Sequence, residues 1–193
     1  MNIFVLHSSP IKSAQLQCDK HVVKMIVESG QMLSTAHRIL DGTQCIRPSK
    51  SGKTKQKYWE HRNSNSEAVL YRAVHVGHPC TVWTMASMQN YIWHYDHFDA
   101  LCVEYTYRYG KIHATQTLLD EILSVPPTNI PSIGLTPFAL AMAAHPECIY
   151  KDPIQSYRAF YQTKQDRFKM VWSKRNVPSW FKSNVNVTEK RAV

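Results

Sequence analysis

The stretch Ser13–Leu40, SAQLQCDKHVVKMIVESGQMLSTAHRIL, decides the fold, because its apolar residues repeat with the period of an α-helix. One face of this helix carries Val22, Met25, Ile26, Ser29, Leu33, Ala36 and Leu40. The opposite side is small or apolar as well, and a helix with two such faces is covered on both. The pattern therefore predicts one long central helix, which Asp41-Gly42 ends.

The strip that remains on this helix is polar, with members three or four residues apart. It consists of Gln17, His21, Lys24, Glu28, Gln31 and Thr35. Side chains at this spacing point the same way. The strip is either a solvated face or the wall of a functional site. A surface Lys24–Glu28 pair contributes only about 0.3–0.5 kcal/mol, so salt bridging alone explains little.

The rest of the chain predicts further helices. The apolar run Asn2–Leu6 suits a short buried strand or an extended anchor. A second long helix is expected from Pro79 to about Tyr109, and a last one from Asp152 to about Trp172. The resulting prediction is an all-α fold, a mostly helical single domain over residues 1–182, with at most a short N-terminal strand. Residues 183–193 are expected to form a polar tail.

A second polar strip follows the second long helix. Its members are Asn90, His94, His97, Glu104 and Arg108. They keep the three-to-four spacing that places side chains on one helix face. Two helices with polar strips can face each other across a cleft, and this is the position that we predict for a site.

The charge of the chain indicates a polyanionic partner. The 193 residues include 23 Lys and Arg against 14 Asp and Glu, a formal net charge of +9. Nucleic acid is the leading candidate for such a partner. We expect phosphate contacts from a basic loop, Arg47–Lys57, and from the outside of the last helix at Arg158, Lys164 and Arg167. No apolar run approaches membrane-spanning length, so no membrane partner is expected.

The cysteines argue against a disulfide framework and against a structural metal. All five are widely scattered and none forms a CxxC pair. A zinc site from Cys18, His21, His78 and Cys80 lacks the paired spacing of known structural sites. We therefore expect reduced thiols, no metal and no cofactor.

Several motifs resemble a known family. They are Cys18–Met25 with Glu28 and Gln31–Leu33, Gly77-His78-Pro79 with Trp83, Arg108–His113, Gly134–Phe138, and Asp152-Pro153 with Tyr157-Arg158. The set resembles the phage-encoded pyrimidine-dimer DNA glycosylases of the endonuclease V type. The resemblance implies a DNA repair enzyme in the cytoplasm of an infected bacterium, which flips a pyrimidine out of duplex DNA.

The resemblance also implies a chemistry. In that family an amine attacks the sugar carbon to form an imine, and a glutamate assists; Glu28 is the matching position. The family uses a terminal amine freed by removal of methionine before a small residue. Here Asn2 follows Met1 and disfavours that removal, so Lys24 and Lys20 are alternative nucleophiles.

Two other functions stay open. The first is a transferase in thymine hypermodification of phage DNA, which joins an amine to activated 5-hydroxymethyluracil and resembles the same glycosylase-like group. The second is a nucleic-acid-binding or host-interaction protein without catalysis, in which the polar strips would face solvent. The sequence leaves the oligomeric state open.

The predicted site follows from these strips and motifs. Its expected catalytic residues are Glu28, Lys24 and His21. Its expected contacts to DNA and to the extruded pyrimidine are Lys20, Gln31, His78, Trp83, Asn90, Arg108, Arg158, Lys164 and Arg167.

Overall fold

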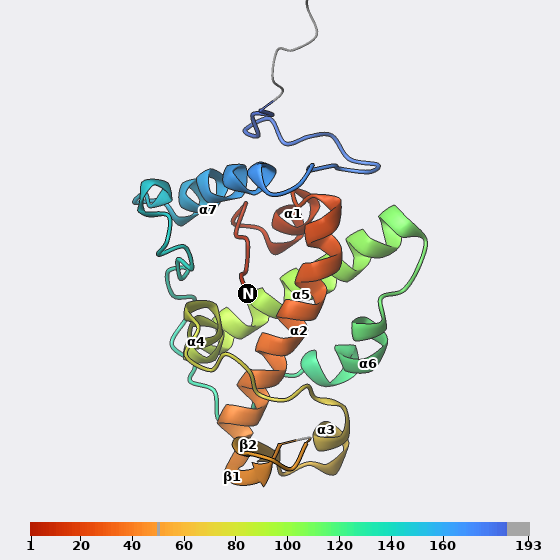
Figure 1. Cartoon of the computed structure of the whole chain (residues 1–193), viewed down its shortest axis with the longest axis vertical. Coiled ribbons are helices and arrows are strands. Elements are labelled where there is room, and N and C mark those ends of the chain that lie inside the picture. The colour runs from red at the N-terminus through yellow and green to blue at the C-terminus, as the bar shows by residue number, and fades with distance from the viewer. Residues whose placement is uncertain (50, 185–193) are drawn as a thin grey trace, which may run out of the picture.

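The computed structural model describes residues 1–49 and 51–184, so most of the predicted tail 183–193 lies outside the described residues. Helices dominate the chain (Figure 1). The elements are α1 (Pro10–Gln15), α2 (Asp19–Asp41), β1 (Gly42–Pro48), β2 (Lys55–His61), α3 (Ser64–Val69), α4 (Pro79–Ala86), α5 (Met88–Tyr109), α6 (Ala114–Leu123), η1 (Pro146–Cys148), α7 (Pro153–Gln162) and η2 (Thr163–Asp166).

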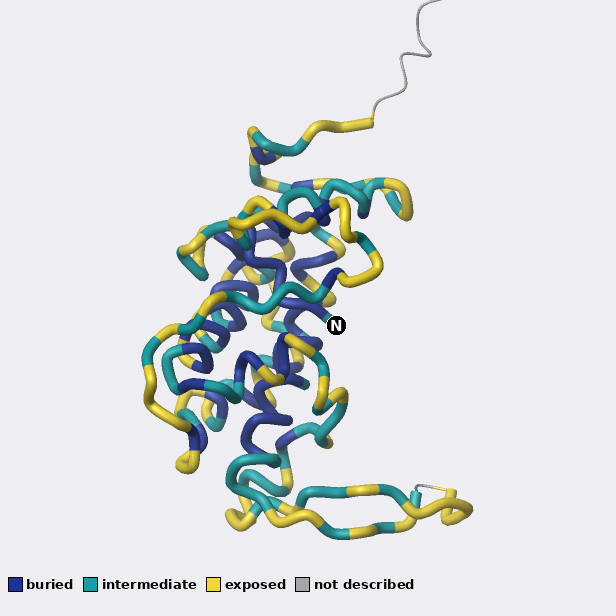
Figure 2. Tube along the Cα trace, turned by 90° about the vertical axis from the view of Figure 1, so that its left-hand side faces the viewer, coloured by how far each residue is buried: buried dark blue, intermediate teal, exposed yellow. Residues whose placement is uncertain are grey.

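The prediction of an all-α fold is wrong. About 50% of the chain is helical, and the fold also contains a two-stranded antiparallel sheet. Strands β1 and β2 pair from Gly42 opposite His61 to Pro48 opposite Lys55. The hairpin projects from one end of the helices and is mostly exposed or half-buried (Figure 2). The two ends of the basic stretch Arg47–Lys57, predicted as a loop, are therefore strand: Arg47 and Pro48 belong to β1, and Lys55 to Lys57 belong to β2.

The hairpin begins where the predicted end of the helix is confirmed. Helix α2 ends at Asp41, and β1 starts with Gly42. A Cβ on Gly42 would collide with the carbonyl oxygen of Arg38, so only glycine lets the chain turn this closely. The β-branched and aromatic residues that follow, such as Ile46 and Tyr58, favour strands.

The prediction of one long central N-terminal helix over Ser13–Leu40 is also wrong. The stretch forms two helices, α1 and α2, and Cys18 between them is extended. Its backbone N–H donates to the hydroxyl of Tyr161 on α7 at 2.9 Å. Because a tertiary partner satisfies this N–H, the helix can break without leaving a buried donor unpaired.

Two more predicted helices have different bounds in the structure. The helix expected from Pro79 to Tyr109 is interrupted at Ser87, which is extended and caps α5 through its side chain. The last helix, α7, ends at Gln162 and not near Trp172. Ser87 Oγ also donates to the carbonyl of Gly134, so the interruption is held from outside the helix.

The N-terminal run Asn2–Leu6 enters the core without forming a strand. Ile3 to Leu6 are buried. The hydroxyl of Ser13 accepts from Leu6 N at 2.9 Å and donates to Phe4 O at 2.8 Å, which replaces the pairing of a strand. The N-terminus therefore lies beside α2 in the middle of the molecule (Figure 1).

The second polar strip is buried within the helical packing, so the predicted cleft between two strips is not observed. Helix α5 packs against α1 and α2. Arg108 on α5 donates to Glu104 at 2.7 Å and to Asp19 at 2.8 Å, and its side chain is fully buried. His97 pairs with Gln17 at 3.1 Å across the α1–α5 contact. The ion pairs of Arg108 are therefore made inside the core, while Gln17 Oε1 and His97 Nδ1 stay buried without a hydrogen-bond partner among the described residues.

Arg38 joins α2 to the hairpin and to α3. Its buried guanidinium donates to Glu67 Oε2 at 2.6 Å and to the backbone carbonyls of Tyr71, Trp59, Glu67 and Leu70.

Removing one partner of a buried ion pair typically costs about 3–5 kcal/mol. We expect Arg38→Met to lower the free energy of unfolding by about that amount in urea denaturation. Arg72→Met, at an exposed position, serves as the control; equal stability of both variants would contradict this role of Arg38.

Candidate functional site

A cavity of about 530 Å³ opens between the N-terminal segment, the first half of α2 and the chain just after α7. Its lining residues are Met1, Asn2, Phe4, Lys20, His21, Lys24, Met25, Glu28, Ala141, Phe160, Lys164, Arg167 and Phe168. The volume lies in the range of small-molecule sites. The wall from α2 consists of residues at helical spacing, so the first polar strip supplies part of the cavity.

Among the described residues that line this cavity, Glu28 is the only one with a carboxylate. Its Oε2 lies 3.8 Å from the α-amine of Met1 and accepts from the backbone N–H of Asn2 at 3.1 Å. Its Oε1 lies 3.2 Å from Lys24 Nζ, whose side chain is 66% exposed, while that of Glu28 is 12% exposed. Glu28 therefore holds a buried amine on one side and an exposed ammonium on the other.

His21 is a neutral member of the wall. Burial, together with the charges of Lys24 and Lys164, lowers the pKa of His21 to about 3. The hydroxyl of Tyr161 accepts from Cys18 N and lies 2.7 Å from His21 Nδ1. Among the described residues this nitrogen is the acceptor within reach of the hydroxyl proton, so the hydroxyl donates to it. The ring proton is then on Nε2. Near neutral pH, His21 acts as a hydrogen-bond donor and not as a general acid.

Lys164 differs from an ordinary surface lysine. Burial, then the charge of Arg167, lowers the pKa of Lys164 to about 8. Its Nζ lies 3.3 Å from the centre of the Phe160 ring. The predicted role in phosphate binding thus falls on a group that is 8% exposed and already inside the cavity. The more accessible cations of the lining are Lys20, which lies over Phe168 at 4.7 Å, Lys24 and Arg167.

Trp83, Asn90 and Arg108, predicted to contact DNA or the base, belong to the interior instead. Trp83 packs against Trp93 and donates to Thr136 O. Asn90 is fully buried and bonds to the backbone of Trp83 and to Thr136. Arg108 is held in buried ion pairs with Asp19 and Glu104. Because these side chains are buried and paired, they stabilise the fold and do not reach the cavity.

The structure does not place Gln31, His78 and Arg158 in the lining of the cavity either. Gln31 is half-buried further along α2. His78 caps α4 by accepting from Cys80 N at 3.2 Å; burial first, and next the charge of the α-amine, lower the pKa of His78. Arg158 donates to Leu6 O at 3.0 Å and lines a separate cavity with Lys12.

Sequence reasoning missed the residues that the N-terminal segment and the end of α7 supply. Phe4, Phe160 and Phe168 give the cavity an aromatic lining. Phe4 stacks on His21 at 4.7 Å and Phe168 meets the same ring edge-on at 5.4 Å. Nothing in the period of α7 indicates the cavity. Only the resemblance to enzymes that use a terminal amine indicated that residue 1 lies at the site.

Within the described ranges, no helix combines the length and apolar character needed to cross a membrane. Comparison of the chain with family models, curated proteins and solved structures yields no match.

Proposed function

We propose that the protein is an enzyme that acts on a pyrimidine nucleotide in DNA by a glycosylase or lyase reaction. The observation that supports this most strongly is the placement of the Met1 α-amine 3.8 Å from Glu28 inside a basic, aromatic cavity. An amine beside a carboxylate is the pair that imine chemistry at a sugar carbon requires.

The amine stays at Glu28 with or without residue 1. If Met1 is kept, its α-amine is the nearby amine. If Met1 is removed, the nitrogen of Asn2 becomes the α-amine, and it already lies 3.1 Å from Glu28 Oε2. The context of Met1-Asn2 therefore no longer favours Lys24 or Lys20 as the nucleophile.

The proposed reaction uses the chain's own groups. The uncharged amine donates its electron pair to C1′ of the deoxyribose, and the bond from C1′ to the base nitrogen breaks with its electrons leaving on the base. Glu28 accepts the proton that the amine loses and stabilises positive charge on the sugar. The sugar ring then opens: the C1′–O4′ bond breaks with its electrons leaving on O4′, and Glu28 returns its proton to that oxygen. This leaves a protonated imine between C1′ and the protein, and the departed base takes a proton from water. Water returns the amine by hydrolysis of that imine.

The remaining lining suits an extruded base. Aromatic rings stack on bases with about 1–3 kcal/mol each, whatever the base. Phe4, Phe160 and Phe168 supply such rings, and the Nε2–H of His21 supplies a donor for a base or sugar oxygen. Lys20 and Arg167 lie where phosphates next to an extruded nucleotide would pass. Extrusion costs a few kcal/mol and least at a damaged base.

Salt dependence tests the electrostatic part of the proposal. We expect the double change Lys20→Gln with Arg167→Gln to reduce the slope of log Kobs against log salt by about 0.9 for each lost duplex contact. Affinity should fall similarly for all DNA sequences, as measured by fluorescence anisotropy from low to moderate salt.

Lys→Gln changes at Lys55 and Lys57 test the hairpin separately, because it follows the C-terminal end of α2, away from the N-terminus beside the middle of that helix (Figure 1). Wild-type DNA binding that does not respond to salt would contradict phosphate contact altogether.

The activity itself is tested with duplex DNA that carries a single pyrimidine dimer or a single 5-hydroxymethyluracil. We expect the protein to release the base or cleave the strand at the altered site, without added metal. Transfer of an added amine onto the base, with the glycosidic bond intact, would replace this proposal with a base-modifying transferase. Binding without any change to the DNA would identify a binding protein.

A further inference from the structure

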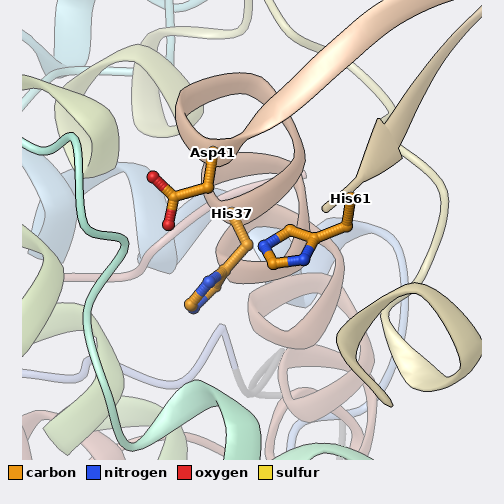
Figure 3. Close-up of side chains that lie close together, drawn as sticks. All are labelled: His37, Asp41 and His61. Carbon is orange, nitrogen blue, oxygen red and sulfur yellow. The ribbon is translucent and has the colours of Figure 1, made fainter. Parts of the chain in front are cut away.

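A second cavity, of about 690 Å³, lies at the other end of α2, between the hairpin, α3 and α6. His37 and Asp41, four residues apart in the last turns of α2, line it together with His61 from the end of β2. Figure 3 shows the three side chains converging from the two elements. Their donor atoms all lie within 4.8 Å of one another.

The tautomer of His37 leaves one nitrogen free to bind. The hydroxyl of Tyr91 donates to the carbonyl of Leu123 at 2.9 Å, so it accepts from His37 Nε2 at 2.8 Å. The ring proton is then on Nε2 and the lone pair is on Nδ1. A second ring nitrogen that donates to a fixed partner is the arrangement that orients metal-bound histidines.

The carboxylate of Asp41 is oriented in the same way. Its Oδ1 accepts from the backbone and side chain of Asn129 at 2.9 and 3.0 Å. Its Oδ2 accepts from Thr128 N at 2.7 Å and keeps a free lone pair. Hydrogen bonds of this kind hold ligating carboxylates in place.

His61 has a buried ring nitrogen, Nε2, without a hydrogen-bond partner in the described structure. The ring nitrogen farther from the backbone points toward His37 and Asp41 (Figure 3). Nδ1 accepts from Asn63 N at 3.2 Å, a long contact at the exposed edge. Binding through Nε2 moves the ring proton to Nδ1 and ends this contact, which costs little because Asn63 N can turn to water.

We propose that His37 Nδ1, Asp41 Oδ2 and His61 Nε2 form a binding site for a divalent transition metal, with Zn²⁺ as its simplest occupant. Zinc binds nitrogen and carboxylate ligands at about 2.0–2.1 Å in a tetrahedron, which puts ligand atoms about 3.3 Å apart. Small side-chain rotations close the present set to that spacing. Imidazole ligands favour such metals over Mg²⁺ and Ca²⁺, which prefer oxygen.

Three protein ligands leave the fourth position open to the cavity. Open sites of this kind bind a water or a substrate group and differ from closed structural sites. The ion would also tie the end of β2 to α2 and so stabilise the hairpin. The site uses none of the groups that surround Glu28, so it stands independently of the proposed reaction.

The test is a titration of tag-free protein with Zn²⁺, in which binding is measured by calorimetry. Mg²⁺ is the comparison ion. We expect one Zn²⁺ per chain at this site, and no Mg²⁺ binding. His61→Ala and Asp41→Asn should each raise the Zn²⁺ dissociation constant by about 100-fold or more, since even residues that only support a metal ligand contribute about 10- to 100-fold to affinity. Circular dichroism checks that both variants fold. Zn²⁺ affinity that is unchanged in both folded variants would overturn the proposal.

A second cluster, His145, Glu147 and Cys148, provides the matched control, because its donor atoms meet the same distance limit. His145→Ala should leave the high-affinity site intact. Co²⁺ in place of Zn²⁺ should show no thiolate-to-metal absorption band, since the proposed ligands contain no sulfur. Loss of binding in His145→Ala, or a thiolate band, would assign the metal to the second cluster and overturn the proposal.

Tyr91→Phe tests the orienting hydrogen bond. It keeps the ring in the core and removes the acceptor of His37 Nε2–H. We expect Zn²⁺ affinity to fall by about 10- to 100-fold with the hairpin still folded. An equal affinity in this variant would remove Tyr91 and the assigned His37 tautomer from the site.

Discussion

Glu28→Gln is expected to lower turnover on the correct DNA substrate by about 100- to 10,000-fold, the usual contribution of a positioned general acid or base. The amide keeps the shape of the side chain and can still accept from Asn2 N. It cannot accept a proton from the amine or stabilise a cationic sugar. DNA affinity should stay nearly unchanged, because the cavity cations Lys20 and Arg167 are retained.

Single-turnover kinetics measure the rate with the wild type or the variant at a concentration that saturates the DNA. Equilibrium binding measures the DNA affinity of the same two proteins. Glu147→Gln is the control, since its side chain is 63% exposed and outside the cavity. Full activity of folded Glu28→Gln would remove Glu28 from the mechanism. A large loss of DNA affinity in the variant would instead assign Glu28 to binding.

Blocking the terminal amine is expected to abolish covalent chemistry. A Gly-Ser dipeptide added before Met1 converts the α-amine into an amide, whose nitrogen has no basic lone pair and cannot form an imine. The new terminal amine of the dipeptide lies two residues farther along the chain from Glu28. Acetylation of the same amine also converts it into an amide and adds fewer atoms. Turnover should fall below detection in both proteins, while DNA affinity stays within a few-fold.

Two controls separate this effect from general damage. The same dipeptide placed after Val193 should leave turnover unchanged. Lys24→Met should retain covalent chemistry, because Lys24 is an exposed neighbour of Glu28 and not the attacking amine. Normal turnover by the extended protein would contradict the assignment of the amine at residue 1.

Hydrophobic periodicity located the helices better than it located their ends. A buried stripe is visible in sequence because it repeats every three to four residues. The breaks at Cys18 and Ser87 are not, since tertiary partners on Tyr161 and Gly134 hold them. The hairpin was missed because its residues are all half-buried or exposed, so neither strand shows a clear alternation of apolar and polar residues, and Lys55 and Lys57 in β2 made the region resemble a basic loop.

The helical spacing predicted that His21, Lys24 and Glu28 share one face, and the structure places all three in the wall of the cavity. The strip loses its access further along α2. Thr35 is buried and bonds to the backbone of Gln31 and Val74, so this part of the strip is covered by the chain before α4. Periodicity reports a shared face, but it carries no information on which neighbour covers it.

The position of Met1 was beyond any pattern in the sequence. It depends on the run Ile3–Leu6 passing through the core and on Ser13 fixing its backbone. These contacts join the N-terminal segment to α1, and no local period encodes them. The polar strip of α5 shows the same limit, because a buried ion-pair network and a solvated face have the same spacing.

Borohydride reduction during turnover shows directly whether an imine forms between the protein and the DNA. Borohydride reduces an imine to a stable amine, so it joins the protein covalently to the DNA if the proposed intermediate forms. We expect a covalent adduct on duplex DNA with an altered pyrimidine, and peptide mass mapping should place the sugar on the α-amine of the first residue. An adduct on Lys24, Lys20 or Lys164, or turnover that borohydride neither traps nor stops, would contradict the account.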